Sequence, residues 1–252
     1  MRMNTTLVIN SKGGSGKTTL ATNLASCFAA QDIPTAIMDY DPQGSSLAWL
    51  RLRTSAGVRI HGANAAPAKA GRIRSIDMHV PEDTQQLLID APAGASGLLL
   101  QEMLSRADGI LIPVPPSAID IHATANFVRD LLILGRVRTR SIRLAAVANR
   151  VRSAMPVYQP LERFLASLGL PLLARIRDSE VYLRAAETGI GIFEMDPAEA
   201  TAELGEFAPI VDWVDPQREP AAARVIELLR PRRLDRAGPV VAARSSTLGG
   251  AS

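Results

Sequence analysis

Asn10-Ser-Lys-Gly-Gly-Ser-Gly-Lys-Thr-Thr19 is the most informative stretch of this 252-residue chain. The apolar run Leu7-Val8-Ile9 precedes it, and a helical pattern begins near Lys17. A glycine-rich loop between a strand and a helix is the setting of a phosphate-binding loop, whose backbone N–H groups and helix N-terminus attract an anion. We therefore expect a nucleotide to bind to Gly13, Gly14, Ser15, Gly16, Lys17, Thr18 and Thr19.

Two positions of the loop depart from the common pattern G-x-x-x-x-G-K-[ST]. Ser11 stands at the first glycine position, and a second lysine, Lys12, lies inside the loop. We expect Lys17 to reach the β- and γ-phosphates and the Thr18 hydroxyl to bind Mg²⁺. Two ammonium groups in one loop repel each other unless phosphates lie between them, so Lys12 needs a separate role.

The rest of the chain predicts an α/β fold. Short apolar runs alternate with helical patterns, and most runs are continuously apolar, which is typical of strands buried on both faces of a sheet. We predict a three-layer, doubly wound, mostly parallel sheet flanked by helices, the P-loop NTPase fold. The expected strands are residues 5–10, 35–39, 87–90, 108–114, 144–149 and 172–176, with a further candidate at 58–60. The expected helices are 17–31, 98–104, 117–134, 158–168, 181–188 and 221–229, and one that follows Ser45 with Leu47, Trp49, Leu50 and Leu52 as its apolar positions. Residues 54–84 and 194–220 give no clear pattern.

Polar residues follow the predicted strands at their carboxyl ends, where ligands bind in parallel sheets. Asp90 ends an apolar run in the context of a Walker B motif and is expected to hold Mg²⁺ through water, beside Thr18. Pro92 and Gly94 follow at once, where a γ-phosphate-sensing switch (switch II) would lie. Asp39 and Asp41 occupy alternate positions, so both carboxylates can face the nucleotide. A structural turn before Pro42 is the alternative explanation for Asp41.

Three motifs resemble those of the ParA/MinD family of deviant Walker A, SIMIBI-class ATPases. They are Lys12-Gly-Gly-Ser-Gly-Lys-Thr18, Asp39-Tyr-Asp-Pro-Gln-Gly44 and Asp90-Ala-Pro-Ala-Gly94. The resemblance implies ATP or ADP and Mg²⁺ as cofactors, and slow hydrolysis by Lys12, Lys17 and Asp41. It implies that Lys12 crosses to the nucleotide of a partner in an ATP-bound homodimer, and that Asp41 orients the attacking water. It also implies that Asp39 supports the metal site or the dimer interface, and that Asn149 hydrogen-bonds adenine.

Arginines supply nearly all of the remaining positive charge, since the lysines are only Lys12, Lys17 and Lys69. In ParA-like proteins arginines of the second half bind DNA without sequence preference, a contact that phosphates alone can supply. A solvated charged face is the alternative. The candidate DNA-binding residues are Arg136, Arg138, Arg140, Arg152 and Arg163.

Composition bounds the remaining possibilities. No apolar run approaches the ~20 residues of a membrane span, and Cys27 is the single cysteine. Because the first strand begins within a few residues of Met1, we expect no signal peptide. We expect a cytoplasmic protein, with one ATPase domain at residues 1–230 and a disordered tail at residues 231–252. No membrane partner is expected.

Two segments, Val147-Ala-Asn-Arg-Val151 and Arg177-Asp-Ser-Glu-Val-Tyr182, resemble those of small ParA-type positioning ATPases, among them the McdA proteins of carboxysomes. This resemblance implies a nucleoid-associated ATPase that positions a carboxysome, plasmid or chromosome, with hydrolysis stimulated by a McdB- or ParB-like cargo adaptor. A MinD-like membrane-cycling ATPase is the main alternative, because residues 224–233 combine apolar and arginine positions around Pro231. An amidoligase of the same fold is a third.

Overall fold

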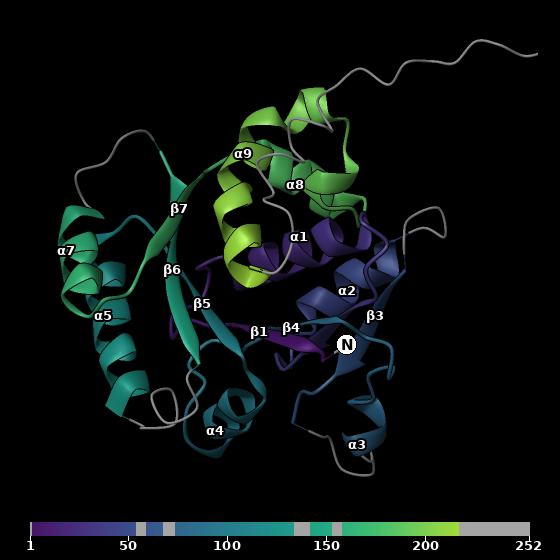
Figure 1. Ribbon diagram of the computed structural model, residues 1–252, viewed down its shortest axis with the longest axis horizontal. Coiled ribbons are helices and arrows are strands. Elements are labelled where there is room, and N and C mark those ends of the chain that lie inside the picture. The colour runs from purple at the N-terminus through teal and green to yellow at the C-terminus, as the bar shows by residue number, and fades with distance from the viewer. Residues whose placement is uncertain (1, 54–58, 68–73, 134–141, 153–157, 217–252) are drawn as a thin grey trace, which may run out of the picture.

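The computed structural model describes residues 2–53, 59–67, 74–133, 142–152 and 158–216 of the chain (Figure 1). The helix expected at residues 221–229, the domain boundary expected at residue 230 and the arginines Arg136, Arg138 and Arg140 lie outside these residues. So do residues 224–233, on which the membrane-cycling alternative depends.

A single parallel sheet forms the centre of the described chain. Its seven strands are arranged in the order β3-β2-β4-β1-β5-β6-β7, and every pair of neighbours is parallel. The strands are β1 (Asn4–Val8), β2 (Thr35–Asp39), β3 (Ile60–Asn64), β4 (Gln86–Asp90), β5 (Gly109–Val114), β6 (Arg143–Val151) and β7 (Leu172–Arg177). The predicted fold class is confirmed. The candidate strand at residues 58–60 falls at the start of β3, which begins at Ile60 and continues to Asn64.

Helices cover both faces of this sheet (Figure 1). Side chains of α4, α5 and α7 share a core with Leu7 and Ile9, whereas those of α1, α2, α8 and α9 share the opposite core with Val8. Successive residues at the end of β1 thus point into two separate cores, which explains why the run Leu7-Val8-Ile9 is continuously apolar. The helices are α1 (Lys17–Ala29), α2 (Ser45–Leu52), α3 (Arg74–Asp77), α4 (Gly97–Arg106), α5 (Ala118–Ile133), α7 (Gln159–Ser167), α8 (Glu180–Glu187), η2 (Ile192–Glu194, a 3-10 turn) and α9 (Pro197–Val214).

Helix α9 occupies a segment whose prolines and acidic residues concealed a helix. Its start is capped by Asp196, whose side chain accepts a hydrogen bond from the N–H of Ala198. Proline is tolerated in the first turn of a helix, whereas Pro209 lies inside this one. Buried apolar residues, among them Leu204 and Phe207, pack α9 into the core that it shares with α1. This burial stabilises the helix against the bond that Pro209 removes.

The connections place all of the predicted motifs at one edge of the sheet. Asp39 and Asp90 are register partners on neighbouring strands, and the residues after β1 follow the strand next to β4. The glycine loop therefore lies beside both carboxylates.

Candidate nucleotide-binding site

The glycine loop joins β1 to α1 and is supported from behind. Gly14 and Gly16 have φ angles of 73° and 93°, a left-handed backbone that favours glycine. The amide of Asn149 donates a hydrogen bond to the carbonyl of Ser15 at 2.8 Å, and a Cβ at position 16 would collide with that amide. The loop therefore needs glycine at position 16 because a polar side chain from β6 fills the space.

Buried Asn10, which the sequence analysis did not single out, ties the loop to β5 and α5. Its Nδ2 donates to the carbonyl of Pro113 at 2.7 Å and to Oγ1 of Thr124 at 3.2 Å. Its Oδ1 accepts the N–H of Lys12 at 3.3 Å. The Asn10 amide thus fixes the backbone at the start of the loop, because it uses both its donor and its acceptor.

Asp90 lies at the floor of the site. Its Oδ2 accepts a 2.8 Å hydrogen bond from Thr18 Oγ1 and a second bond from Ser46 Oγ, while the side chain is almost fully buried. The expected neighbourhood of Asp90 and Thr18 is thus present. Ser46, in the first turn of α2, was missed, although it directly follows the Asp-Pro-Gln-Gly-Ser motif.

Burial and hydrogen bonding set the charge of Asp90. Burial raises the pKa of this carboxyl to about 6, although the hydrogen bonds from Ser46 and Thr18 oppose the rise. Nearby Asp39 raises the pKa further, and the Lys17 ammonium lowers it. A cation placed beside this carboxylate would favour its ionised form.

The two lysines of the loop have different surroundings. Lys17 is buried, its Nζ donates to the carbonyl of Lys12 at 3.1 Å, and burial lowers its pKa while Asp90 and Asp41 raise it. The Lys12 side chain is 43% exposed, and its Nζ lies 3.4 Å from Oδ1 of Asp120, at the start of α5. One ammonium thus faces the interior of the loop and the other lies outside it.

Asp39 and Asp41 shape the turn between β2 and α2. Asp39 Oδ1 accepts the N–H of Asp41 at 2.9 Å, and its Oδ2 accepts the N–H groups of Ser46 and Leu47 at 3.1 and 3.3 Å. Burial raises the pKa of Asp39, while these backbone bonds lower it. Because three N–H groups already occupy its carboxylate, direct metal binding by Asp39 stays a prediction.

Asp41 forms the structural turn that was its alternative explanation. Its Oδ1 accepts the N–H of Gln43 at 2.9 Å, an Asx-type turn. This bond occupies one of the two carboxylate oxygens and leaves a role toward water as a prediction.

The segment after Asp90 contacts the loop directly. The N–H of Gly94 donates to the carbonyl of Ser11 at 3.0 Å, and Pro92 is buried. Gly94 has a φ of 67°. The predicted switch II residues therefore lie against the start of the nucleotide loop.

The two described arginines of the DNA-binding prediction, Arg152 and Arg163, belong to different elements. Arg152 lies at the end of β6 beside the nucleotide loop, where it pairs with Asp178 at 2.7 Å. Arg163 is exposed on α7. A contact of either residue with DNA stays a prediction.

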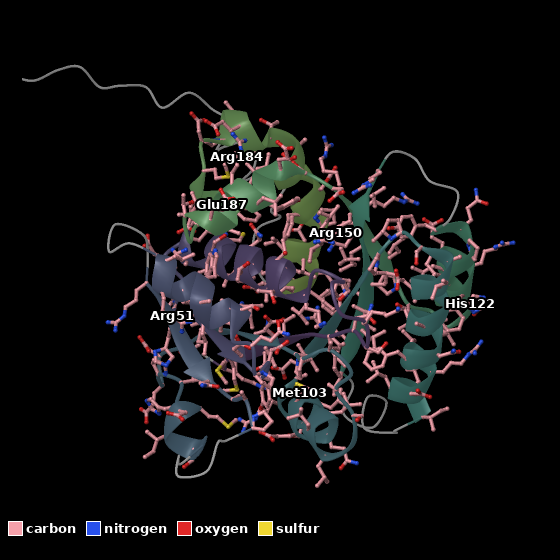
Figure 2. The ribbon with its side chains drawn as sticks, turned by 180° about the vertical axis from the view of Figure 1, so that it is seen from behind. Arg51, Met103, His122, Arg150, Arg184 and Glu187 are labelled. Carbon is pink, nitrogen blue, oxygen red and sulfur yellow. The ribbon has the colours of Figure 1, made fainter. Side chains whose placement is uncertain are left out.

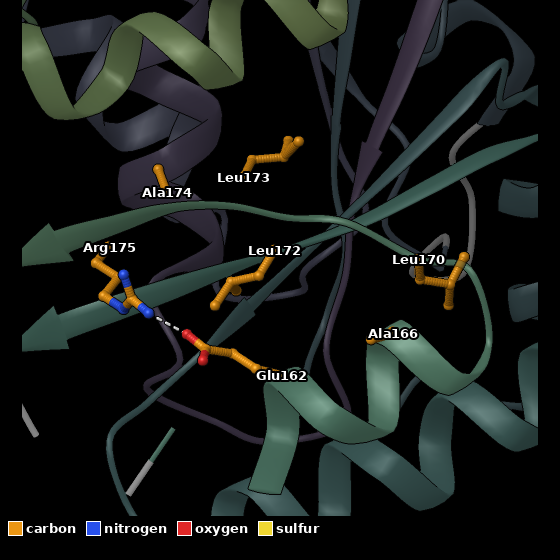
Figure 3. Close-up of a pocket in the computed structure, with 7 residues that line it drawn as sticks. All are labelled: Glu162, Ala166, Leu170, Leu172, Leu173, Ala174 and Arg175. Carbon is orange, nitrogen blue, oxygen red and sulfur yellow. Dashed lines mark hydrogen bonds and ion pairs between the residues drawn. The ribbon is translucent and has the colours of Figure 1, made fainter. Parts of the chain in front are cut away.

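Two hollows accompany these elements. One, of about 510 Å³, borders the loop at Gly13 and Gly14. The other, of about 360 Å³, lies between α7 and β7, and the ion pair of Arg175 with Glu162 crosses it (Figure 3). No loop residue lines this second hollow, whose lining is Glu162, Ala166, Leu170, Leu172, Leu173, Ala174 and Arg175. The hollow at the loop therefore borders the candidate site, and its further lining residues are Pro115, Pro116, Asp120, Arg150, Arg152 and Asp178.

The donor set of the site fits Mg²⁺. Among the described residues, Asp90 Oδ1 is buried and has no hydrogen-bond partner. The other oxygen of this carboxylate, Oδ2, accepts the hydrogen bond from the Thr18 hydroxyl. Mg²⁺ bound with a nucleotide takes one or two protein oxygens, and waters and phosphates supply the rest. A buried carboxylate oxygen with no partner is therefore suited to a metal-bound water.

The site combines a glycine loop with the buried Lys17, the Thr18 hydroxyl and the Asp90 carboxylate at the end of a strand. This combination defines a P-loop nucleotide-binding protein. The family model described as the CobQ/CobB/MinD/ParA nucleotide binding domain matches residues 6–192, and the chain belongs to this family. The resemblance inferred from the three motifs is confirmed.

Individual relatives extend the match over most of the chain. Maintenance of carboxysome distribution protein A from Halothiobacillus neapolitanus is 26% identical over 221 residues, which cover 84% of this chain and 96% of that protein. A structure of McdA from Cyanothece in complex with ATP is similar with a TM-score of 0.62 at 16% identity, over 86% of this chain and 98% of that one. Cobyrinic acid a,c-diamide synthase from Mycobacterium smegmatis, with bound ADP and magnesium, is similar with a TM-score of 0.54 at 19% identity, over 74% of this chain and 93% of that one. At such identities the two structures show a shared fold.

Proposed function

We propose that this chain is a Mg²⁺-dependent ATPase that dimerises on ATP, binds nucleoid DNA without sequence preference and positions an intracellular cargo. A carboxysome-type role is favoured, with plasmid or chromosome partition as the related possibility. A relative that matches 84% of this chain is named for carboxysome distribution, which supports this cargo. A cargo adaptor that stimulates hydrolysis completes the proposal, and the site of action is the nucleoid surface in the cytoplasm.

Different residues of the site would bind different parts of Mg·ATP. Backbone N–H groups of Gly13 to Thr19 hold the phosphates, and the Lys17 ammonium neutralises the β- and γ-phosphates. Thr18 and Asp90 would hold Mg²⁺, the latter through water. When bound, this ion supplies charge neutralisation at the transferred phosphoryl group. Asn149 supports the loop through Ser15 and would approach the adenine from the same strand end.

Two further residues would act on hydrolysis itself. Asp41 would orient the attacking water with the carboxylate oxygen that its Asx turn does not use. Lys12 would neutralise charge on the phosphates of a partner subunit's nucleotide, in the manner of an arginine finger. The observation that carries the proposal is the placement of the two lysines. Lys17 is buried inside the loop, whereas the Lys12 side chain is 43% exposed outside it.

A comparison of two lysine variants tests this division. Lys12→Ala should bind ATP like the wild type, yet remain monomeric by light scattering and lose at least about tenfold in turnover. Lys17→Ala is the matched control, because it removes the interior ammonium and should weaken ATP binding itself. Wild-type turnover in Lys12→Ala would contradict the role of Lys12 in a partner's site.

Co-sedimentation with ATP separates the proposed DNA binding from membrane cycling. The wild type should pellet with DNA of arbitrary sequence, and binding should weaken steeply with salt because phosphate contacts release counterions. Binding to anionic liposomes in place of DNA would favour the MinD-like alternative. Among residues of the described ranges, no helix is long and apolar enough to cross a membrane.

Imaging of a fluorescent fusion tests the cellular role. The wild-type fusion should lie over the nucleoid and the Lys12→Ala fusion should be diffuse. Loss of regular cargo spacing in the variant would identify the positioned body, and unchanged spacing of every candidate body would contradict the positioning role.

A further inference from the structure

The end of β6 contains a bulge next to the nucleotide loop. Ala148 pairs with Arg175 and Val151 with Arg177, so three steps along β6 correspond to two along β7. An extra residue of this kind redirects the side chains around it, and bulges are frequent beside functional sites. Here the two residues between the paired positions are Asn149, which supports the loop, and Arg150.

Arg150 has a backbone conformation that is unfavourable for an arginine. Its φ is 57°, in the left-handed region that glycine and asparagine adopt more readily than other residues. Among the described residues other than glycine, only Asp32, in the turn after α1, shares a positive φ. Strained backbones of this type persist where neighbouring structure enforces them, and they cluster at ligand sites.

The carboxylates that line the same hollow as Arg150 are paired with other cations. Arg150 lines the 510 Å³ hollow together with Gly13 and Gly14. It lies near the carboxyl end of β6 and is labelled in Figure 2. The two carboxylates of that hollow already have cationic partners, since Asp120 lies 3.4 Å from Lys12 and Asp178 lies 2.7 Å from Arg152. Within the described part of the chain, exposed Arg150 forms no ion pair.

We propose that Arg150 is a further nucleotide-binding residue, whose guanidinium hydrogen-bonds a phosphate group of the nucleotide held by the loop. This inference rests on the proposed binding of ATP and adds a cation that the glycine-loop motif does not contain. A planar guanidinium can donate two parallel hydrogen bonds to one phosphate, which a lysine cannot do. The bulge provides the direction of approach, and the strain is the cost of holding the side chain there.

A pair of glycine variants separates binding from backbone strain. Arg150→Gly and Asp32→Gly remove a side chain at the same φ, but only Arg150 lies beside the nucleotide loop. Both nucleotide-free variants should melt about 2–4 °C above the wild type, because glycine adopts this backbone without strain. Titration calorimetry with Mg·ADP should show an affinity about tenfold weaker for Arg150→Gly and unchanged for Asp32→Gly.

Salt dependence identifies the contact as one to phosphate. The affinity difference between wild type and Arg150→Gly should shrink between about 50 mM and about 500 mM KCl, because screening weakens a charge–charge contact. Arg150→Asn, which also tolerates a positive φ, should repeat the loss of affinity. Equal Mg·ADP affinity in wild type and both Arg150 variants, or a loss independent of salt, would overturn the inference while the nucleotide function stands. A wild type that does not bind Mg·ADP would overturn the proposed function as well.

Discussion

Replacing Asp90 by asparagine should make the nucleotide-free protein more stable at neutral pH. The wild-type carboxylate is almost fully buried, and burial raises its pKa from the ordinary value of 3.8 to about 6. A group whose pKa is raised on folding stabilises the folded chain while it is protonated, below about pH 4. That stability is lost as the pH rises through about 6, because the carboxyl must then ionise in a buried place.

The size of the effect follows from the two pKa values. A change from 3.8 to about 6 corresponds to about 3 kcal/mol between the protonated and ionised forms. Asparagine keeps an acceptor for Thr18 and Ser46 and carries no charge at any pH. The free energy of unfolding of Asp90→Asn, minus that of the wild type, should therefore rise by about 2 kcal/mol between pH 4 and pH 7.5, because at pH 4 the unfolded carboxyl is already about half ionised.

Urea unfolding in EDTA, without nucleotide, measures this difference at each pH. Ser46→Ala is an informative companion, because it keeps the carboxylate and removes a hydrogen bond that lowers its pKa. The pH dependence of Ser46→Ala should shift to higher pH than that of the wild type. A stability difference between Asp90→Asn and wild type that is the same at every pH would refute the reasoning.

Two further pairs of variants, each with a matched control, probe the glycine loop and a buried ion pair. Gly16→Ala should cost at least about 2 kcal/mol of stability and abolish ATP binding, because its Cβ collides with the Asn149 amide. Gly44→Ala is the control, because Gly44 also has a positive φ but open space around it. It should cost only about 1 kcal/mol in thermal or urea unfolding. Arg53→Ala should cost about 3 kcal/mol, because it leaves Glu194 unpaired where the two side chains are only 8% and 12% exposed. Arg152→Ala, from an ion pair with an 80% exposed arginine, should change the free energy of unfolding by less than about 1 kcal/mol, and equal losses in the two arginine variants would contradict this difference.

The features that the sequence predicted correctly are those encoded within a few consecutive residues. The glycine loop, the strand ending at Asp90 and the continuous apolar strands all lie in short segments, and a parallel sheet brings their carboxyl ends together. The helix from Ser117 onward is another case. The Ser117 hydroxyl accepts the N–H of Asp120 at 3.1 Å, a capping bond that is typical of serine at the start of a helix.

Features that depend on distant contacts were beyond local reasoning. Helix α9 has prolines that disfavour a helix, and its stability comes from burial against α1 and β7. The bond of Ser46 to Asp90 joins residues 44 positions apart, and the strain at Arg150 arises from the mismatch of β6 with β7. Periodicity along the chain contains no information on such pairings.

In the proposed dimer, Lys12 would exchange its ionic partner Asp120 for a phosphate of the second subunit's nucleotide. A lysine that must leave one carboxylate to reach a phosphate forms one ionic contact and breaks another. Added salt screens both contacts, so the two effects oppose each other in the dimerisation equilibrium. The affinity of such a dimer would depend on ionic strength less than that of one whose lysine starts in open solvent.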